Sequence, residues 1–517
     1  MAQYTRTFAE KHNGTVLVGY EQANITENAL SGKNDHLFDP YIGELNNAKG
    51  TKNKSVSSNS DELTREGFFG RLMYDYDSKY FASAGIRRDA SSKFAPGHRW
   101  GTFGYLSAAW MITKEEFMKP YKWLNELKLK ASWGCQGNDL GIGYHAYSDY
   151  YTTSYNEETG QYSVAMSAKG NDELTWEKNK EWNFGVEFAM FDSRLSGIIE
   201  FYTRNTSDLL YNRTLPLSSG YNVSVYPVNV GAMRNTGIEV SLEGVPVRTT
   251  NFEWDVNLNF THNYNKITKL DPTVPKEGLK YSNRIIKEGK SLYEMYMVKY
   301  AGVDKSTGEA LYYKDTKDND GNTVTTTTND LTKADKYDLG TSLPDLIGGF
   351  GTGVKFYGFD LSAQFAFSLG GKMYDGSYQA LMHNGQSPGS ALHKDILKAW
   401  SPENPNSNIP RLSVAAADDP GSGSQTPIDR FVTSTNYLSL NNLTLGYTLP
   451  KTLVEKAALS NVRVYVSGEN LFVTSKRKGM DPRYSISGIG SMTSGSGLNT
   501  GGYATMRSLV FGISLTF

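Results

Sequence analysis

The feature that most constrains this chain is an alternation of apolar and polar residues that continues for about ten residues at a time. Between Phe252 and Phe260 every even position is aromatic or aliphatic, whereas Glu253 and Asp255 stand between them. Successive side chains of a β-strand point to opposite faces, so the pattern predicts strands with one apolar and one charged face. Ordinary strands have ~5–6 residues and membrane-crossing strands need ~9–11, so the pattern favours membrane strands.

The same pattern recurs along the chain and predicts about 15 strands. Further examples are residues 127–133, 182–190, 238–243 and 359–367. The run GGFGTG (348–353) resembles a nucleotide loop, but its glycines continue into another strand, so glycines that permit sheet curvature are the favoured interpretation.

Near the end of the chain, Leu438 and Leu440 are out of phase with Leu443. This break in the alternation predicts a β-bulge at Asn441–Asn442.

The connections between the predicted strands alternate between short and long. Short ones are expected at Asn13–Gly14, at Asp77–Lys79 and at Tyr357–Gly358, and Thr113 with Glu116 predicts a capped helical turn. The long loops are expected near residues 26–65, 135–180, 205–234, 265–342, 370–434 and 473–504. Short periplasmic turns and long outer loops are typical of outer-membrane barrels.

The last residues follow the same pattern. Phe511, Ile513, Leu515 and Phe517 lie on one face of a predicted terminal strand. On a lipid-facing surface an aromatic terminus is stable, and pairing with the first strand of the barrel would leave no open edge.

Composition excludes several classes of function. The net charge of -1 gives no basic bias, so a nucleic-acid partner is not expected. Cys135 is the single cysteine, which excludes an internal disulfide and a cysteine metal cluster. No segment approaches the ~20 apolar residues of a membrane helix, and the first residues have no signal-peptide core.

The sequence predicts no catalytic, cofactor or metal site, and therefore no enzyme. The seven histidines are scattered without zinc-ligand spacing, and no nucleophile elbow is present. In DTKDNDGN (315–322) only Asp318 and Asp320 fit a calcium loop, so a solvated loop is the expectation there. Acids such as Glu253 are explained equally well as inward-facing polar residues of a barrel.

One loop segment is dense in aromatic residues. The segment GYHAYSDYYTTSY (143–155) contains Tyr144, Tyr147, Tyr150, Tyr151 and Tyr155. Tyrosine rings stack on sugars and also bury well in protein interfaces. We hypothesise contact with a ligand; contact with a lid protein or with other loops is the stronger alternative.

Several segments resemble the SusC/RagA family of TonB-dependent outer-membrane transporters. They are residues 80–118, 123–139, 174–188, 229–240, 399–412, 437–451 and 461–484, in family order. No single segment is a catalytic fingerprint, but their joint occurrence is specific. The terminal Phe517 also resembles the barrel-assembly signal of the family.

This resemblance implies an all-β protein with a transmembrane antiparallel β-barrel of about 22 strands around a plug. It implies TonB-powered uptake of oligosaccharides or peptides beneath a SusD-like surface lipoprotein, in the outer membrane of a Bacteroides-like bacterium. Residues 1–517 are expected to be a single C-terminal part of that barrel, without the plug, the TonB-contacting segment and about seven strands (about 22 minus about 15).

Two other functions stay open from the sequence. One is a passive porin or a barrel-borne adhesin whose long loops do the work. The other is a secreted soluble β protein that binds or cuts glycans, which would bury its aromatic faces between two sheets. The length of the alternating runs favours the barrel over the sandwich.

Overall fold

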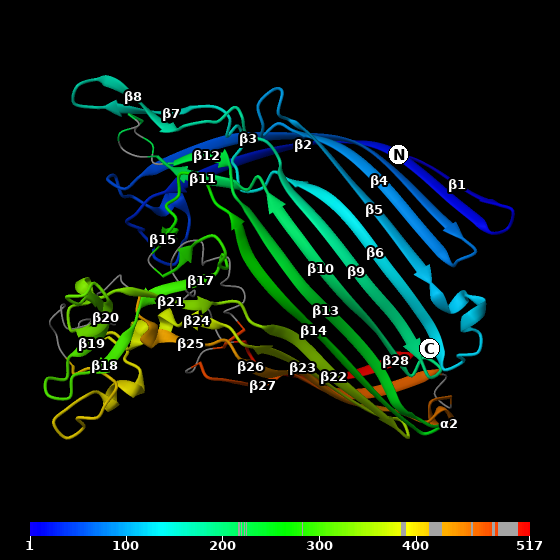
Figure 1. Cartoon of the computed structure of the whole chain (residues 1–517). Coiled ribbons are helices and arrows are strands. Elements are labelled where there is room, and N and C mark those ends of the chain that lie inside the picture. The colour runs from blue at the N-terminus through cyan, green and yellow to red at the C-terminus, as the bar shows by residue number, and fades with distance from the viewer. Residues whose placement is uncertain are drawn as a thin grey trace. The chain divides into compact units, whose positions relative to one another are not determined.

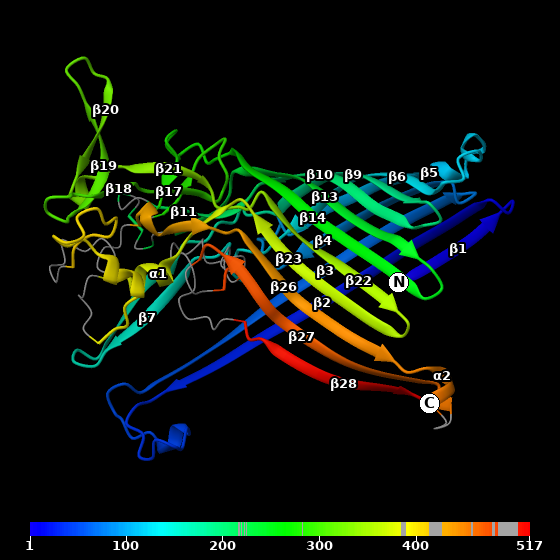
Figure 2. The same ribbon diagram turned by 90° about the horizontal axis from the view of Figure 1, so that it is seen from below.

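The computed structural model describes the chain except for residues 216, 217, 219, 222, 224, 282, 384–388, 413–426, 456–458, 478–480 and 484–504. Its main element is an antiparallel sheet of 15 strands, as many as the alternation predicts (Figures 1 and 2). In their order across the sheet the strands are β1 (Ala2–Phe8), β2 (His12–Lys33), β3 (Ser55–Tyr76), β4 (Tyr80–Ser91), β5 (Trp100–Met111), β6 (Leu124–Asn138), β9 (Glu177–Met190), β10 (Leu195–Ser207), β13 (Ala232–Arg248), β14 (Phe252–Lys269), β22 (Leu346–Phe356), β23 (Phe359–Leu369), β26 (Tyr437–Thr448), β27 (Asn461–Ser475) and β28 (Ser508–Thr516).

The connections carry smaller sheets and short helical turns. The small sheets pair β7 (Tyr150–Asn156) with β8 (Gln161–Ala168), β11 (Leu210–Thr214) with β12 (Val225–Asn229), β15 (Leu279–Lys280) with β16 (Ile285–Ile286), β17 (Glu294–Val298) with β21 (Lys336–Thr341), β24 (Lys372–Tyr374) with β25 (Val432–Ser434), and β18 (Tyr300–Val303) with β19 (Ala310–Lys317) and β20 (Thr323–Thr328). The helical elements are η1 (Leu45–Asn47), η2 (Ile112–Lys114), η3 (Glu116–Met118), η5 (Leu331–Lys333), α1 (Gly376–Leu381), η6 (Lys394–Lys398), η8 (Asp429–Phe431) and α2 (Lys451–Val454). Within the described residues, no helix has the length and apolarity needed to cross a membrane.

The two faces of the main sheet differ as the alternation predicts. Large apolar side chains remain exposed on one face, among them Phe68, Ile86, Trp254, Leu361 and Leu445. The other face carries ion pairs between neighbouring strands, including Lys355 with Glu253, Arg463 with Asp360 and Arg204 with Glu181. A sheet that exposes its apolar face and pairs charges on the other is suited to lipid outside and water inside.

Most strands of the main sheet are longer than the ten or so residues expected from the alternation, although β1 and β28 are shorter. The strands β2 and β3 pair without interruption from His12 with Tyr76 to Lys33 with Ser55. Both ends of the long loop expected near 26–65 are therefore strand. The turn expected at Asn13–Gly14 instead lies at Ala9–Lys11, where Ala9 and Glu10 have positive φ, because Asn13 and Gly14 pair with β1.

Two local expectations are confirmed. Residues 348–353 lie inside β22 and pair with both β14 and β23. The register of β26 shifts between Leu440 and Asn442 on both of its neighbours, so Asn441 is the bulged residue.

The helical turn predicted from Thr113 and Glu116 is confirmed, but Thr113 lies inside η2 and does not cap it. The segment does contain two short helical turns, η2 and η3, but Glu115 precedes η3 and makes no side-chain cap. The Thr113 hydroxyl accepts a hydrogen bond from the Leu127 amide (3.3 Å) instead. The hydroxyl therefore ties the turn to the start of β6.

The contacts divide the chain into two compact units, which are considered separately. The first comprises residues 1–111, 130–182 and 204–232, and the second comprises residues 112–129, 183–203 and 233–517. Each unit has a small apolar core in its loop region. The core of the first is Phe94, Phe103, Ile142, Leu174 and Trp176; that of the second is Met295, Met297, Val298, Ala310, Tyr312, Tyr374, Met382, Ile396, Ile428 and Phe431.

The C-terminal strand β28 pairs with β27 along its length (Figure 2). Phe511, Ile513, Leu515 and Phe517 are all exposed, Phe511 to 79%. In the strand order β28 stands last and β1 stands first, so the pairing of the terminal strand with the first strand of a complete barrel stays a prediction.

Candidate functional site

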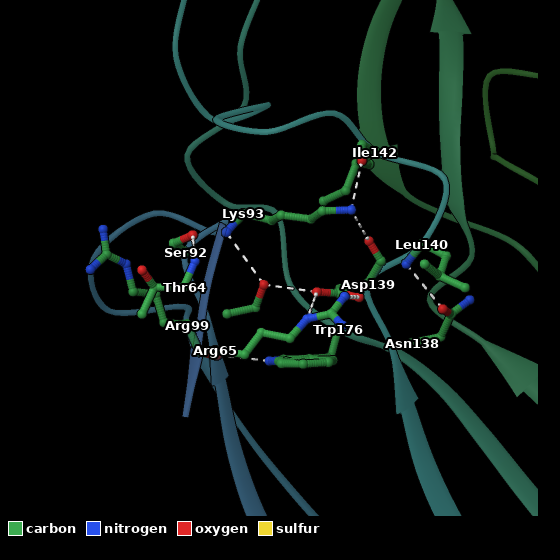
Figure 3. A network of polar contacts seen from close by, with 11 residues as sticks. Thr64, Arg65, Ser92, Lys93, Arg99, Asn138, Asp139, Leu140, Ile142 and Trp176 are labelled. Atoms are coloured by element: carbon green, nitrogen blue, oxygen red, sulfur yellow. Dashed lines mark hydrogen bonds and ion pairs between the residues drawn. The ribbon is translucent and has the colours of Figure 1, made fainter. Parts of the chain in front are cut away.

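A buried polar network anchors the tyrosine-rich segment to the strand ends of the first unit (Figure 3). Asp139 directly follows β6 and is almost completely buried. Its carboxylate accepts two hydrogen bonds from Arg65 of β3 (2.6 and 3.2 Å) and one from the Ser91 hydroxyl of β4 (2.8 Å). A bidentate arginine fixes both the position and the orientation of a carboxylate, so β3 and β4 together hold the start of the loop that follows β6.

Lys93 completes the network from the β4–β5 connection. Its ammonium group donates to the carbonyl oxygens of Asp139 and Ile142, each at 3.2 Å. The side chain is 8% exposed, and its nitrogen lies 5.6 Å from the ring centre of Tyr144. A buried charge needs such partners, because an unpaired ammonium group in the interior is costly. Lys93 therefore fixes the turn that leads into Tyr144.

The apolar core of the first unit lies beside this network. Phe94 is completely buried, and its ring lies 5.3 Å from that of Trp176. Phe103 meets the same indole edge-on at 5.5 Å. The Trp176 indole N–H donates to the Arg99 carbonyl (2.8 Å), so its polar atom is also satisfied. The aromatic contacts keep the β4–β5 turn against the segment that enters β9.

A second set of hydrogen bonds holds the end of the same loop that precedes β9. The Asn171 side chain donates to the Pro227 carbonyl (2.8 Å). The side chain of Asn229 accepts from the Thr175 amide (2.8 Å) and donates to the Thr175 carbonyl (2.7 Å). Both ends of the segment between β6 and β9 are thus fixed to other strands, which limits the motion of the residues between them.

The five predicted tyrosines separate into two groups. Tyr144 donates to Glu27 (3.3 Å), and Tyr150 donates to the Tyr144 carbonyl (3.1 Å). Tyr147 packs edge-on against His145 at 5.9 Å. Burial, followed by the charge of Glu27, raises the pKa of Tyr144, so its hydroxyl stays protonated and able to donate. Tyr144 and Tyr147 are half-buried packing residues at the base of the loop, whereas Tyr150 is the first residue of β7 and is 41% exposed.

Tyr151 and Tyr155 belong to the exposed hairpin formed by β7 and β8. Opposite them in the register stand Met166 and Tyr162, and Val164 lies between these two on the same face. Tyr151 is 58% exposed and Tyr162 is 76% exposed. We call Tyr151, Tyr155, Tyr162, Val164 and Met166 the hairpin face.

The base of the hairpin is held by an ion pair. The Lys169 ammonium group lies 2.9 Å from Asp149, and the Gly170 amide donates to the same carboxylate (2.9 Å). The hydrogen bond from Lys169, followed by that from Gly170, lowers the pKa of Asp149. The pair closes the hairpin just outside its first and last paired residues.

The polar face of the first unit contains a hollow of about 680 Å³. Phe69, Phe103 and Tyr105 line it together with Arg87 and Asp89. Arg87 lies 2.6 Å from Asp89 and also pairs with Glu21. The hollow therefore offers aromatic surface beside charges that are already paired.

Glycine opposite the rings keeps this hollow open. Gly85 stands directly opposite Tyr105 in the register, and a Cβ on Gly85 would lie 2.3 Å from the tyrosine ring. Because glycine has no side chain, the ring can lie against the strand instead of projecting from the sheet.

The remaining segments singled out in the sequence show no competing site. Asp318 accepts hydrogen bonds from the amides of Asp320 and Asn322, so it shapes the β19–β20 turn. Among the described residues, no cluster of three or more His, Cys, Asp or Glu side chains could hold a metal ion. Most of the loop expected near 473–504 and part of that near 370–434 lie outside the described residues.

Sequence reasoning missed the residues that support the loop and three of the five residues of the hairpin face. Nothing local distinguishes Lys93 or Asp139 from an ordinary loop charge, because their partners are distant in the chain. Tyr162, Val164 and Met166 did carry a usable signal, since they alternate with Ser163 and Ala165. A strand of that pattern beside a tyrosine-rich strand is a hairpin signal.

Long antiparallel strands with an exposed apolar face, an ion-paired polar face and ordered outer loops define a transmembrane β-barrel protein of the outer-membrane class. The chain belongs to the family described as TonB dependent receptor-like, beta-barrel, whose model matches residues 2–471. The expected resemblance is thereby confirmed.

Relatives of known name agree with this membership. TonB-dependent receptor P3 of Formosa agariphila is 29% identical over 542 residues, covering 99% of this chain and 51% of the relative. TonB-dependent receptor SusC of Bacteroides thetaiotaomicron is 28% identical over 521 residues, covering 97% and 48%. The chain spans about half the length of the curated relatives it matches.

Solved structures show the same fold. The RagAB peptide transporter matches with a TM-score of 0.82 and 29% identity, over 100% of this chain and 54% of that chain. The same importer in its 'closed-closed' state matches with a TM-score of 0.83. The relatives compared are receptors and transporters rather than enzymes.

Proposed function

We propose that this chain forms part of the barrel of a TonB-dependent importer for oligosaccharides or peptides in the outer membrane. The observation that carries the proposal is the ordered loop between β6 and β9, at one end of a sheet that has one apolar and one polar face. Asp139 and Lys93, both buried, hold a loop whose hairpin face remains exposed. An exposed aromatic face on a fixed support is a binding surface, because the loop loses little entropy on binding.

The partner we propose for the hairpin face is a SusD-like surface lipoprotein. Tyr151, Tyr155 and Tyr162 supply flat apolar rings, which are enriched in protein interfaces. Support comes from the family and from RagAB, a peptide transporter at 29% identity. Direct contact with a glycan or peptide is the alternative for the same rings.

Tyrosine substitutions in the native bacterium test this role. We expect Y151A/Y155A to reduce both nutrient uptake and the amount of lipoprotein that copurifies with the receptor. Y41A is the matched control, since Tyr41 is a 95% exposed loop tyrosine in another connection. Lost uptake with retained lipoprotein would indicate ligand contact, and unchanged uptake with unchanged lipoprotein would refute both roles.

Energy dependence separates an importer from a passive porin. Uptake through a TonB-dependent protein requires the proton gradient that drives TonB, so a protonophore should abolish uptake. A passive barrel would continue to admit the same nutrient down its concentration gradient. Persisting uptake after collapse of the gradient would therefore exclude our proposal in favour of a porin.

A further inference from the structure

The strand β20 forms one edge of a small sheet in the second unit. In this sheet β18 is followed by β19 and then by β20, which comprises Thr323–Thr328. Residues 323–327 are all exposed. Figure 2 shows the β19–β20 hairpin extending away from β17 and β21. Within the described part of the chain, the outer edge of β20 therefore faces solvent.

Alternate residues of β20 direct their backbone groups to this edge. Antiparallel strands alternate between residue pairs that exchange backbone hydrogen bonds and pairs that do not. The turn closes with a hydrogen bond from the Asp318 amide to the Asn322 carbonyl (3.0 Å), so Thr323, the next residue, belongs to the second kind. By the same alternation Thr325 and Thr327 also point their N–H and C=O groups outward. We call these three threonines the edge residues.

The hydrogen bonds of β19 agree with this alternation. Tyr313 stands opposite Thr327, and its amide donates to the Lys299 carbonyl (3.0 Å), on the side away from β20. The Tyr313 carbonyl accepts from the Asp335 amide (3.2 Å) on that side as well. Among the described residues, no backbone hydrogen bond joins the edge residues to another segment. Their outward N–H and C=O groups thus form a row that a further strand could pair with.

The opposite edge of the same sheet is covered. The Tyr300 amide of β18 donates to the Asp429 side chain (2.8 Å), and the nearby Val298 amide donates to the Pro427 carbonyl (3.3 Å). Natural proteins commonly protect an open edge with lysine, proline or a bulge. The strand β20 has none of these, because its sequence is TVTTTT and its register with β19 is unbroken. The contrast favours an edge that is kept available for pairing.

Side-chain hydrogen bonds hold this edge in its extended form. The Thr325 and Tyr337 hydroxyls both donate to the Asp315 carboxylate, each at 2.8 Å. The Lys317 ammonium group donates to the Thr323 hydroxyl (2.7 Å). These contacts tie β20 to β19 and β21. The edge is therefore preorganised, and pairing with it orders little further chain.

We propose that β20 binds an extended peptide as an additional strand of this sheet. In this mode of recognition, main-chain hydrogen bonds supply the affinity. The outward groups recur every ~7 Å, twice the ~3.4 Å rise per residue, and so match the backbone of a second strand. An oligosaccharide lacks such a regular row of amide donors and carbonyl acceptors. Because the strand carries no charged side chain, the site accepts peptides of mixed sequence.

The size of the edge favours a small peptide over a docked protein. Six residues form β20, whereas a stable protein interface buries about 800 Å² on each partner. A short edge holds its ligand weakly, which suits a nutrient that must be released again during import. This role in uptake rests on the proposed import function and selects peptides from its two nutrient classes, whereas binding itself needs no import.

Peptide binding to the unaltered protein in detergent tests the proposal. The probe is a fluorescently labelled, uncharged peptide about eight residues long, within the length range of ordinary strands, and its anisotropy reports binding. We expect the same peptide, N-methylated at every amide, to bind about tenfold or more weakly, since it cannot donate hydrogen bonds to the edge. Maltoheptaose should not compete with the labelled peptide.

Two substitutions at one position separate the backbone from the side chain. Thr325→Pro removes the central outward N–H and should weaken peptide binding about tenfold or more, because proline cannot donate to a strand ladder. Thr325→Ala is the matched control, because it removes the same hydroxyl and keeps the N–H. Its peptide binding should match that of the unaltered protein.

Three results would overturn the proposal. The first is equal binding of the two peptides, and the second is equal peptide binding by Thr325→Pro and Thr325→Ala. The third is a dimer in detergent that Thr325→Pro abolishes, which would assign the edge to a second copy of the chain. The peptide comparison uses unaltered protein, so it decides the question even if the proline variant fails to fold. Uptake that persists without the proton gradient would refute the importer and leave peptide binding in detergent intact.

Discussion

At the scale of single residues, the molecule depends on polar side chains whose partners are remote in sequence. Asp139, Arg65 and Lys93 form one group around the buried Asp139, although 74 positions separate Arg65 from Asp139. Local sequence cannot predict such a group, because each residue alone is an ordinary loop charge. The tyrosines were visible locally, but their division into packing residues and an exposed face depends on the register of the hairpin.

Replacing Asp139 with Asn should loosen the loop that follows β6 without unfolding the main sheet. The change removes the negative charge of the carboxylate to which Arg65 and Ser91 donate hydrogen bonds. A hydrogen bond to a charged group contributes about 1.5–3 kcal/mol to stability. We expect faster hydrogen exchange at residues 139–144, while the strands keep their protection. Asp172→Asn, an exposed acid in the same loop, is the control and should change nothing. Equal exchange in both variants would contradict the role of the network.

Acid should open the base of the hairpin. The folded-state pKa of Asp149 is lowered, first by the hydrogen bond from Lys169 and then by that from Gly170. A lowered acid pKa gives a contribution that is present above the unfolded value, about 4, and is lost as pH falls through the folded value. We expect the Gly170 amide to exchange faster in Asp149→Asn than in the unaltered protein at pH 7. If the two proteins match at pH 7, the ion pair does not hold the hairpin.

At the scale of elements, alternation predicted the strands well and their ends poorly. The main sheet has the expected number of strands, and the bulge at Asn441 was visible as a phase change. The strands β2 and β3 extend far past the expected loop boundary. Strands that carry polar residues on both faces can still pair through their backbones outside a membrane. The capping motif at Thr113 failed because a tertiary partner, the Leu127 amide, took the hydroxyl.

A glycine substitution tests the packing on the polar face of the sheet. Gly85→Ala would place a methyl group 2.3 Å from the Tyr105 ring, so the ring must move away from the strand. We expect a loss of about 1–3 kcal/mol in the free energy of unfolding from lipid vesicles. In Tyr105→Ala the same glycine change should cost much less, which a double-mutant cycle would measure.

Gly43→Ala is the control for the glycine substitution, since no atom lies within 4 Å of a Cβ at that position. Its unfolding free energy should not change. Additive effects of Gly85→Ala and Tyr105→Ala would show that the ring does not lie over Gly85.

At the scale of the whole molecule, the sequence predicted the class because membrane strands obey a simple rule. Each strand must present apolar residues to lipid and polar residues to the interior, so long alternating runs follow directly. The same rule does not predict the proposed nutrient or lipoprotein partner, because both proposals depend on loop residues such as Tyr151 and Tyr155. Family membership and the structural match to RagAB agree with the predicted class.

The most direct test of the account is the environment of alternate residues along β14 in the outer membrane. In a Cys135→Ser background, single cysteines at positions 255–260 would carry a fluorescent label. We predict that nitroxide lipids quench the label at 256, 258 and 260, whereas aqueous iodide quenches it at 255, 257 and 259. Quenching by iodide alone at every position, or by neither agent at the even positions, would show that this face does not contact lipid and would contradict a transmembrane barrel.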